Sequence, residues 1–519
     1  MRKAFQIAAR HAGVQAKVQA AVRARVRAGV SAGLAAVLLL AGCSQDKDAA
    51  VKVVVIGDPA SPFGKSPPLS VPARLVRSAT VEGLVGFDEQ GQIIPALADR
   101  WIVTDDGLSY IFRLRDGTWA DGSDLTAQTV RAGLRETIAG LRRTPLALDL
   151  AGIDEIRVMT ERVIEIRLAA PMPNLLQLLA QPELGIARDG RGTGPMRLRR
   201  DGDVALLNAI APESLGLPAV EGWSAMIRPL RLVALPAAAA VDTFNRGDAD
   251  VLLGGRIEDF PLARSVGLIR GTIQMDPVMG LFGLAVTDSP AAKGSGFLAA
   301  PENRETLAMA IDRDALIAPF GLGGWSPTTL LVGAGTADDP GTIGERWAGL
   351  SIDQRRAQAS VRVARWRQAQ HESAPPRLRI AMPQGPGADI LFGRLQADLK
   401  TIGIETQKVG MDEDAELRLV DVVARYPRAG WFLNQLSCTA RRGLCSDTAD
   451  RLSLQAQRAT DPVARSALLA QAEVALTKAN VFIPFGTPIR WSLVRGDANG
   501  FAANHWNIHP LMPMALRPK

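Results

Sequence analysis

The chain has 519 residues, of which 47% are hydrophobic and 22% are charged. This length is too great for one compact core and the composition is that of an ordinary soluble protein, so we expect two or three structural units. The formal net charge is +7, but seven cations precede residue 43, so the remainder is close to neutral. Without a positive field, nothing favours a nucleic-acid partner or an anionic membrane surface.

The N-terminal segment has the charge layout of a signal peptide. Residues 1–42 contain seven cationic side chains, no acidic one, and an apolar run over residues 30–40. That run is about half of the roughly 20 residues that a transmembrane helix requires. We therefore expect a cleaved signal rather than a permanent anchor.

The apolar run ends in the sequence Leu-Ala-Gly-Cys at residues 40–43. These four residues resemble the bacterial lipobox. The resemblance implies that Cys43 is acylated, becomes the mature N-terminus and anchors the protein to a membrane on the periplasmic side of the cell envelope. The alternative is a chance cysteine that follows an uncleaved anchor.

Strands are predicted in the first third of the chain. Residues 51–57 form a nearly continuous β-branched run that indicates a buried strand. Apolar and polar side chains alternate over residues 110–115, which predicts a strand with one wetter face. Residues 153–158 and 163–168 flank a short polar turn, and we expect them to form a hairpin.

Helices are predicted by apolar stripes at helical spacing. They cover residues 126–142, a segment that begins at Pro301, a segment that carries Leu391, Leu395 and Leu399 and stops at Gly403, and residues 461–478. Residues 404–409 resume as a strand. Because strands and helices mix without strict alternation, we predict an α/β fold.

Two short motifs that could indicate nucleotide or metal binding do not meet the requirements of those sites. Residues 64–66 read Gly-Lys-Ser, but six residues separate them from Gly57 where a phosphate-binding loop needs four. His505 and His509 lie in a stretch that does not look helical, so we expect ordinary polar histidines and no metal. Nothing in the sequence supports a catalytic site or a cofactor, and we expect no enzyme activity.

Cys438 and Cys445 are the only cysteines after Cys43. Outside the cytoplasm, a pair separated by six residues in a loop-like stretch predicts a disulfide. The alternative is two reduced thiols.

Segments along most of the chain resemble, in order, the extracytoplasmic solute-binding proteins of dipeptide and oligopeptide ABC importers, known as family 5. The matching segments are VEGLVGF (81–87), IPALADRW (94–101), DGLSYIFRLRDG (106–117), WADG (119–122), GTGP (192–195), FNRGDADV (244–251), RETLAMAIDR (304–313) and QADLKTIGI (396–404).

The resemblance implies a two-lobed periplasmic-binding-protein fold, the Venus-flytrap arrangement, with an extra subdomain inserted in the first lobe. We expect residues 1–42 to be the signal peptide and residues 85–191 the inserted subdomain. Lobe I is then made of residues 43–84, 192–275 and 486–519, and lobe II of residues 276–485. Closure of the lobes around a solute is implied as well.

The resemblance also implies two backbone segments that pair with an extended ligand. One is Ser70, Val71 and Pro72. The other begins with Asp421, Val422 and Val423 and ends at Ala424. The same segments are therefore candidates for ligand binding here.

Arg425 departs from the pattern of the peptide binders, which carry Ala-Asp-Tyr where this chain has Ala-Arg-Tyr. In those proteins the aspartate binds the free α-amino group of the ligand, and a cation in its place repels an ammonium. We hypothesise that Arg425 meets a carboxylate or another anionic group. The alternative is that Arg425 forms an ion pair with a nearby acid such as Asp421 and only fills space. Trp431 either stacks on the ligand or belongs to the core.

The function that the resemblance implies is capture of a peptide-like or carboxylate-bearing small solute and its delivery to an inner-membrane ABC permease. We expect a monomer. The alternative is an envelope lipoprotein of the same fold that acts as a sensor or interaction partner without transport.

Overall fold

The computed structural model describes residues 50–518, except for residues 143, 265–270, 291–295, 338–340, 342, 372 and 497. The predicted signal peptide and Cys43 lie outside the described residues. Within the described part of the chain, no helix is long and apolar enough to cross a membrane.

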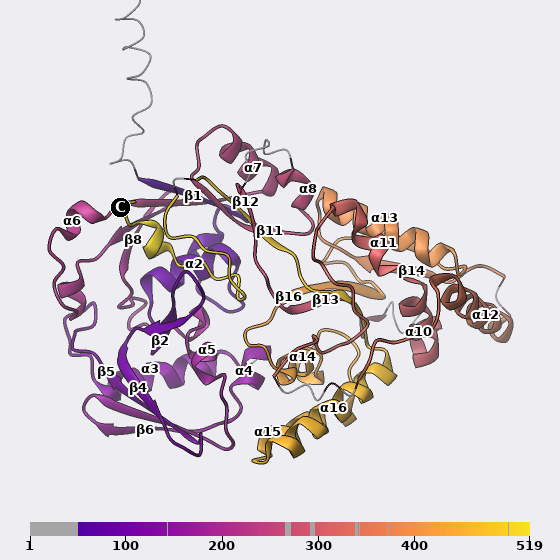
Figure 1. Ribbon diagram of the computed structural model, residues 1–519, viewed down its shortest axis with the longest axis horizontal. Helices are drawn as coiled ribbons and strands as arrows, with labels where there is room; N and C mark the ends of the chain where they lie inside the picture. The colour runs from indigo at the N-terminus through magenta and orange to yellow at the C-terminus, as the bar shows by residue number, and fades with distance from the viewer. Residues whose placement is uncertain are drawn as a thin grey trace, which may run out of the picture. The chain divides into compact units, whose positions relative to one another are not determined.

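A seven-stranded sheet gathers segments from distant parts of the chain (Figure 1). Its strands, in spatial order, are β12 (Ile273–Met275), β18 (Arg490–Val494), β11 (Val251–Arg256), β1 (Val51–Ile56), β10 (Leu230–Leu235), β9 (Val204–Ala209) and β8 (Met196–Asp201). β1 lies between the parallel strands β10 and β11. As a central strand it is buried at Val51, Val53, Val54 and Val55, as its β-branched sequence predicts.

Helices cover this sheet on both faces. Val53 and Val55 share a core cluster with Leu75 and Val76 of α2 (Val71–Thr80). Val54 instead joins a cluster that includes residues of α7 (Ala237–Asn245). Shorter helices in this part of the chain are α6 (Trp223–Met226), α8 (Phe260–Ala263) and α17 (Leu511–Met514).

Residues 98–168 form a four-stranded antiparallel sheet. It is ordered β4 (Ala98–Val103), β5 (Ser109–Leu114), β7 (Val163–Leu168) and β6 (Ile153–Thr160), and it packs against α3 (Ala127–Gly140), α4 (Pro145–Asp149) and α5 (Leu175–Leu179). A small ribbon of β2 (Val85–Phe87) and β3 (Ile93–Pro95) precedes it. The predicted hairpin and the strand before it are confirmed.

A five-stranded sheet is built from the later part of the chain. Its order is β15 (Glu405–Val409), β14 (Arg377–Ala381), β16 (Leu417–Val423), β13 (Gly280–Val286) and β17 (Phe482–Gly486). The accompanying helices are α10 (Pro301–Ala310), α11 (Arg313–Ile317), α12 (Ile352–Gln370), α13 (Pro386–Lys400), α14 (Ala429–Gln435), α15 (Asp447–Arg458) and α16 (Pro462–Ala479).

Capping interactions fix several predicted helix ends. Thr126 and Thr129 form a capping box at the start of α3, which ends at Gly140, two residues earlier than predicted. The Asp461 carboxylate accepts hydrogen bonds from two amides in the first turn of α16. Gly403, at a φ of +79°, permits the turn between α13 and β15.

The chain passes between the seven-stranded and five-stranded sheets twice, at residues 276–279 and 487–489. Asp276 fastens the first passage. Its carboxylate accepts hydrogen bonds from the amide of Asn504 at 2.9 Å, from Nδ2 of Asn507 at 2.7 Å and from Nε2 of His509 at 3.1 Å. The C-terminal segment therefore holds a crossing segment from the side.

Candidate functional site

Strand β16 has an open edge. β13 pairs with this strand along its whole length, but β14 pairs with it only at Leu417 and Arg418. Within the part of the chain that the structure describes, no strand pairs with residues 419–423 on the side of β14. This edge can therefore accept another extended backbone.

The alternation of an antiparallel pair decides which backbone groups face the open edge. The amide of Ala424 donates to the carbonyl of Met279 at 2.8 Å. Since hydrogen-bonded positions recur at every second residue, the amides and carbonyls of Leu419, Asp421 and Val423 point away from β13. The three amides and the carbonyls of Leu419 and Val423 can pair with a ligand, whereas the Asp421 carbonyl accepts from Nη2 of Arg490.

A cavity of about 970 Å³ adjoins this edge. Asp421 and Val422 of β16 line it, together with Arg256 and Glu258, which lie at and just after the end of β11. The loop that carries Arg441 and Arg442 closes another side, and the Cys438–Cys445 disulfide predicted from the sequence joins the two ends of this loop.

The Asp421 side chain forms a buried ion pair with Arg490. Nη1 of Arg490 donates to both carboxylate oxygens, at 2.8 and 2.9 Å, and Nη2 donates to the Asp421 carbonyl at 3.3 Å. Both side chains are buried. Burial lowers the pKa of Arg490, while the adjacent Asp421 carboxylate opposes that shift. Asp421 is therefore not the acid that pairs with Arg425.

Ser70, Val71 and Pro72 lie at a helix start rather than in a strand-like segment. Ser70 is extended and caps α2, with its Oγ accepting from the amide of Ala73 at 3.3 Å. Val71 and Pro72 already belong to the first turn of α2. The expectation of a continuous extended segment here is corrected, because proline at the second helical position favours the helix.

Charge interactions connect α2 with the loop after β16. Arg74 of α2 forms an ion pair with the buried Glu183, with Nε 3.7 Å from Oε1. Burial opposes ionisation of Glu183, but the fields of Arg74 and Arg425 hold its pKa below the ordinary value. Burial lowers the pKa of Arg74, and Arg425 and Arg256 contribute to that shift. The structure thus brings Arg425 close to residues near the start of α2.

Arg425 itself is half-buried and makes no hydrogen bond or salt bridge with any residue that the structure describes. It lowers the pKa of Glu183 and opposes the rise in the pKa of Asp149, so its guanidinium lies within electrostatic reach of both. Its five donors remain available to an acceptor that enters the site.

Arg442 is a second half-buried cation beside the cavity. Nη2 donates to Oε1 of Gln435 at 2.7 Å, whereas Nε is buried without a hydrogen-bond partner among the described residues. Burial, and then the neighbouring Arg425, lower the pKa of Arg442 to about 10. Two guanidinium groups thus approach each other with neither in a salt bridge to a described carboxylate. An anion placed between them would relieve the repulsion.

Trp431 lies in the core. Its side chain is fully buried and packs edge-to-face on Phe432, with ring centroids 5.0 Å apart. Trp431 therefore belongs to the core and does not face a ligand in this structure.

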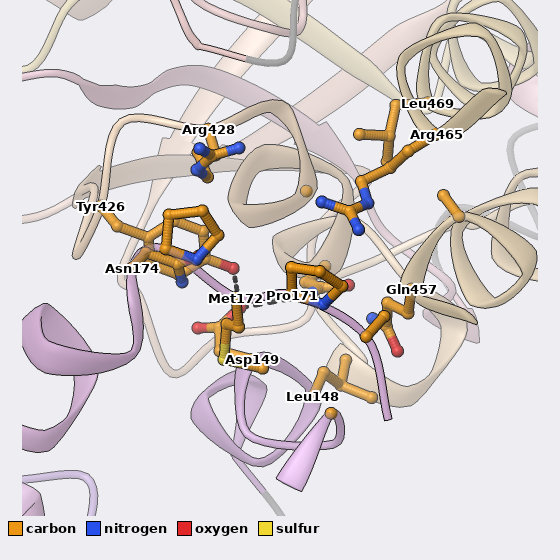
Figure 2. A pocket seen from close by; sticks show the side chains of 16 residues that line it. Leu148, Asp149, Pro171, Met172, Asn174, Tyr426, Arg428, Gln457, Arg465 and Leu469 are labelled. Carbon is orange, nitrogen blue, oxygen red and sulfur yellow. Dashed lines mark hydrogen bonds between the residues drawn. The ribbon is translucent and has the colours of Figure 1, made fainter. Parts of the chain in front are cut away.

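A separate, small pocket of about 90 Å³ lies between residues 148–174 and residues 426–469 (Figure 2). Asp149 of α4 points toward Tyr426 there. Its Oδ1 accepts from the Tyr426 hydroxyl at 2.8 Å and from Nδ2 of Asn434 at 2.9 Å. Burial raises the pKa of Asp149 to about 6, against the opposing effects of Arg425 and of these two donors. This contact joins the helices of the four-stranded sheet to those of the five-stranded sheet.

His505 and His509 contact the crossing segment at residues 276–279. His509 is buried beside Asp276, and Nδ1 of His505 lies 2.7 Å from the Pro277 carbonyl oxygen. Among the described residues, no group of three or more His, Cys, Asp or Glu side chains could hold a metal ion.

Comparison with known proteins shows similarity to extracellular solute-binding proteins. Residues 92–200 match the family described as bacterial extracellular solute-binding proteins, family 5 Middle. The chain is 34% identical over 121 residues to the probable deoxycholate-binding periplasmic protein YgiS of Escherichia coli K12, covering 20% of this chain and 23% of that protein. It is 30% identical over 152 residues to the glutathione-binding protein GsiB of the same strain, covering 28% of each. These alignments span about a quarter of each relative.

Solved structures match over nearly the whole chain. The murein tripeptide binding protein MppA of Escherichia coli aligns with a TM-score of 0.75 at 18% identity, covering 90% of this chain and 98% of that one. Haemophilus influenzae OppA in complex with RPPGFSPFR aligns with a TM-score of 0.74 at 16% identity, covering 90% and 99%.

The fold is therefore that of the two-lobed periplasmic binding proteins, and the predicted α/β class is confirmed. Residues 92–200 match the model of the family 5 solute-binding proteins, which agrees with the resemblance found in the sequence.

Sequence reasoning placed Asp421, Val422 and Arg425 near the site but missed Glu258, Arg442 and Arg490. Arg442 could have been found, because the predicted disulfide places it in a short closed loop. Arg490 and Glu258 gave no local signal, since each reaches the site from the other side of a chain crossing.

Proposed function

We propose that this protein is the solute-binding component of an ABC importer and captures a peptide-like or carboxylate-bearing small solute between its two lobes. The observation that carries the proposal is the open edge of β16 beside a cavity of about 970 Å³, with Arg425 and Arg442 near it and in no salt bridge to a described carboxylate. The backbone edge supplies affinity for an extended solute. The two guanidinium groups supply selectivity for an acid.

The relatives bind solutes compatible with this chemistry. One is named as probably binding deoxycholate and another as binding glutathione. Both compounds bear carboxylate groups. The structural neighbour OppA was solved with a nine-residue peptide. These names support a peptide-like or carboxylate-bearing solute.

The cellular setting belongs to the same proposal. The protein acts as a monomer on the periplasmic side of the envelope, anchored through acylated Cys43, and delivers its solute to an inner-membrane permease without chemical turnover. Lobe I consists of residues 43–84, 192–275 and 486–519, the inserted subdomain of residues 85–191, and lobe II of residues 276–485. Solute shifts the population toward the closed state because only that state contacts it from both sides.

The test is a titration of the variant Arg425→Asp. Native mass spectrometry of protein purified without refolding identifies the retained solute, and calorimetry compares that solute with its carboxamide analogue. Loss of a charge-assisted hydrogen bond predicts that the acid binds roughly 10- to 100-fold more weakly to the variant. Binding of the carboxamide should change little.

Arg246→Asp is the control, since Arg246 is exposed at the C-terminal end of α7 and contacts only Asp242, Asp248 and Thr243 among the described side chains. It should bind both compounds like the unmodified protein. If Arg425→Asp keeps the original preference for the acid over the carboxamide, the assignment of Arg425 is wrong.

A further inference from the structure

Residues 216–226 form an apolar surface segment that lies outside the proposed solute site. Ten of these eleven residues are exposed, and Trp223 is half-buried. Leu217, Val220 and Met226 are 42%, 40% and 41% exposed. The segment carries a single charged side chain. Isolated apolar side chains are common on protein surfaces, whereas a run of exposed apolar residues marks a contact with another apolar surface.

The apolar segment is fixed at both of its ends. Gly216 has a φ of +76°, and a Cβ there would lie 1.8 Å from the Asp116 carbonyl oxygen, so the chain approaches Asp116 closely at this point. At the other end, the Met226 carbonyl accepts from the amide of Arg517 at 2.8 Å. Between these ends, amides donate to carbonyls three to five residues earlier, at Leu217, Trp223 and Ala225.

The apolar segment lies at the end of the seven-stranded sheet where the described chain begins. β1 and β10 are parallel, so both strands start at this end. The amide of Val51 in β1 donates to the carbonyl of Pro229 at 2.8 Å, and Pro229 follows the segment by three residues. The C-terminal residues lie beside the same segment, next to α6 (Figure 1).

The length of chain between Cys43 and β1 limits how far this end of the sheet can lie from a membrane. Seven residues, 44–50, separate Cys43 from Val51. Fully extended, a linker of this length spans roughly 25 to 30 Å. Acyl chains on Cys43 would therefore keep the start of β1, and the apolar segment beside it, close to the bilayer surface.

Cationic side chains border the apolar segment. Arg228 and Arg517 are half-buried, while Arg231 and its register partner Lys52 are exposed. The charge within the segment is the carboxylate of Glu221. An arginine can lay its aliphatic stem along an apolar surface and reach a headgroup phosphate with its guanidinium. Apolar side chains bordered by cations are typical of contacts at a membrane surface.

We propose that the apolar segment contacts the lipid bilayer to which Cys43 is anchored, with Leu217, Val220 and Met226 inserted among the headgroups. The partner is a lipid surface. This inference rests on the acylation of Cys43 in the proposed function and goes beyond it. A tether alone leaves the protein free to turn, whereas this contact holds one end of the seven-stranded sheet against the membrane.

The experiment places a fluorescent bimane label on the full chain, expressed with its signal peptide so that Cys43 can be acylated. Cys438 and Cys445 form a disulfide, so the variant Val220→Cys supplies the thiol for the label. The protein is reconstituted into vesicles that contain an excess of phosphatidylethanolamine over phosphatidylglycerol. Val361→Cys is the matched control, because Val361 is 57% exposed on α12 in the proposed lobe II.

Iodide in the water should quench the label at position 220 at least about 3-fold less than the label at position 361, since the bilayer shields an inserted side chain. Nitroxide-bearing lipids should quench the label at position 220 and leave the label at position 361 unchanged. Equal quenching by iodide at the two positions overturns the inference.

A pair of charged substitutions separates insertion from mere proximity to the membrane. Leu217→Glu with Met226→Glu, added to the chain labelled at position 220, should restore iodide quenching to the level seen at position 361, because desolvating a carboxylate is costly. Leu454→Glu with Val463→Glu, at positions that are 49% and 77% exposed, should leave the shielding intact. Thermal midpoints should change little in either pair, because all four positions lie at the surface.

Shielding at position 220 that survives the first pair of glutamates contradicts the inference. Shielding that appears in native envelopes but not in vesicles assigns the segment to a protein partner and contradicts it as well. If mass spectrometry finds Cys43 without lipid in the membrane fraction, the proposed anchoring and this inference fail together. Capture of a solute is tested separately with Arg425→Asp, so it can stand when the membrane contact does not.

Discussion

Asp149 is a buried carboxylate whose environment can be read residue by residue. It lies at the end of α4, and its Oδ1 accepts hydrogen bonds from Tyr426 and Asn434, which follow β16 in the chain. Its Oδ2 is buried without a hydrogen-bond partner among the described residues. The contact therefore holds two parts of the chain together through one oxygen while the other is desolvated.

We predict that Asp149→Asn stabilises the protein at pH 7 and not at pH 4. The folded-state pKa of about 6 exceeds the ordinary value of 3.8. The contribution of Asp149 to stability is therefore fully present below about pH 4 and is lost as the pH rises through 6. The loss is on the order of 1–3 kcal/mol. Asparagine stays neutral and keeps an oxygen for both donors.

Thermal midpoints of variant and unmodified protein at the two pH values check this prediction. Asp154→Asn, on the exposed surface at the start of β6, is the matched control and should shift neither midpoint. An equal difference between Asp149→Asn and the unmodified protein at both pH values would show that titration of Asp149 is not the cause.

Residues with a local signature could be predicted from the sequence, and those defined by distant partners could not. The unusual Arg425 was recognisable because neighbouring residues fixed its alignment to the peptide binders. Asp149 was not recognisable, because its partners lie more than 270 positions away. Glu258 gave no signal because Asp421 and Arg442, which line the same cavity, lie more than 160 positions away in the chain.

At the scale of elements, the loop closed by the Cys438–Cys445 disulfide carries Arg442 to the cavity. Gly443 allows this loop to approach β13, because a Cβ there would lie 2.2 Å from the Val286 carbonyl oxygen. Leu444 then donates from its amide to the same carbonyl at 2.7 Å. The disulfide and this close contact together position the guanidinium of Arg442.

We predict that the double variant Cys438→Ser, Cys445→Ser folds but discriminates less between a carboxylate-bearing solute and its carboxamide. Loss of the cross-link costs about 2–4 kcal/mol of stability, which lowers the thermal midpoint. The freed loop then samples conformations in which Arg442 is away from the acid. Calorimetry with both compounds measures the change, and reductant applied to the unmodified protein should reproduce it. Unchanged discrimination would show that the disulfide does not position Arg442.

Helices and strands with regularly spaced apolar residues could be predicted from the sequence. Elements that bury only a few side chains could not. β1, β5, α3 and α16 lie close to their predicted ranges because each buries a regular face. α12 has 19 residues but fully buries only Ala359 and Val363, so its stripe is too narrow to recognise. α2 was missed although Ser70 as an N-cap residue, with Pro72 in the first turn, is a helix-start signal.

At the scale of the whole molecule, the two crossing segments connect the sheets that flank the cavity. In the first segment, residues 276–279, the Asp276 carboxylate accepts hydrogen bonds from the C-terminal segment. The amide of Asp276 donates to the Arg490 carbonyl at 3.1 Å. Arg490 in turn holds Asp421 at the edge of β16. The crossings and the ligand edge are therefore mechanically linked through a few buried groups.

We predict that Asp276→Ala destabilises the protein by about 3–5 kcal/mol, because it leaves buried donors unpaired. The backbone amide of Asn504, the side-chain amide of Asn507 and the imidazole of His509 all lose their acceptor. Asp276→Asn keeps one acceptor oxygen and should cost less. Asp248→Ala, which removes an exposed partner of Arg246, should change stability by less than about 0.5 kcal/mol.

Chemical denaturation monitored by tryptophan fluorescence measures these differences. Asp276 holds a crossing segment and does not line the cavity, so the folded Asp276→Ala protein should prefer carboxylates as the unmodified protein does. Its affinity for all solutes should fall by the same factor, because the crossing segment no longer fixes the positions of the lobes. A selective loss of acid binding would place Asp276 in the site instead. Equal stability of Asp276→Ala and Asp248→Ala would show that the C-terminal segment does not hold the crossing.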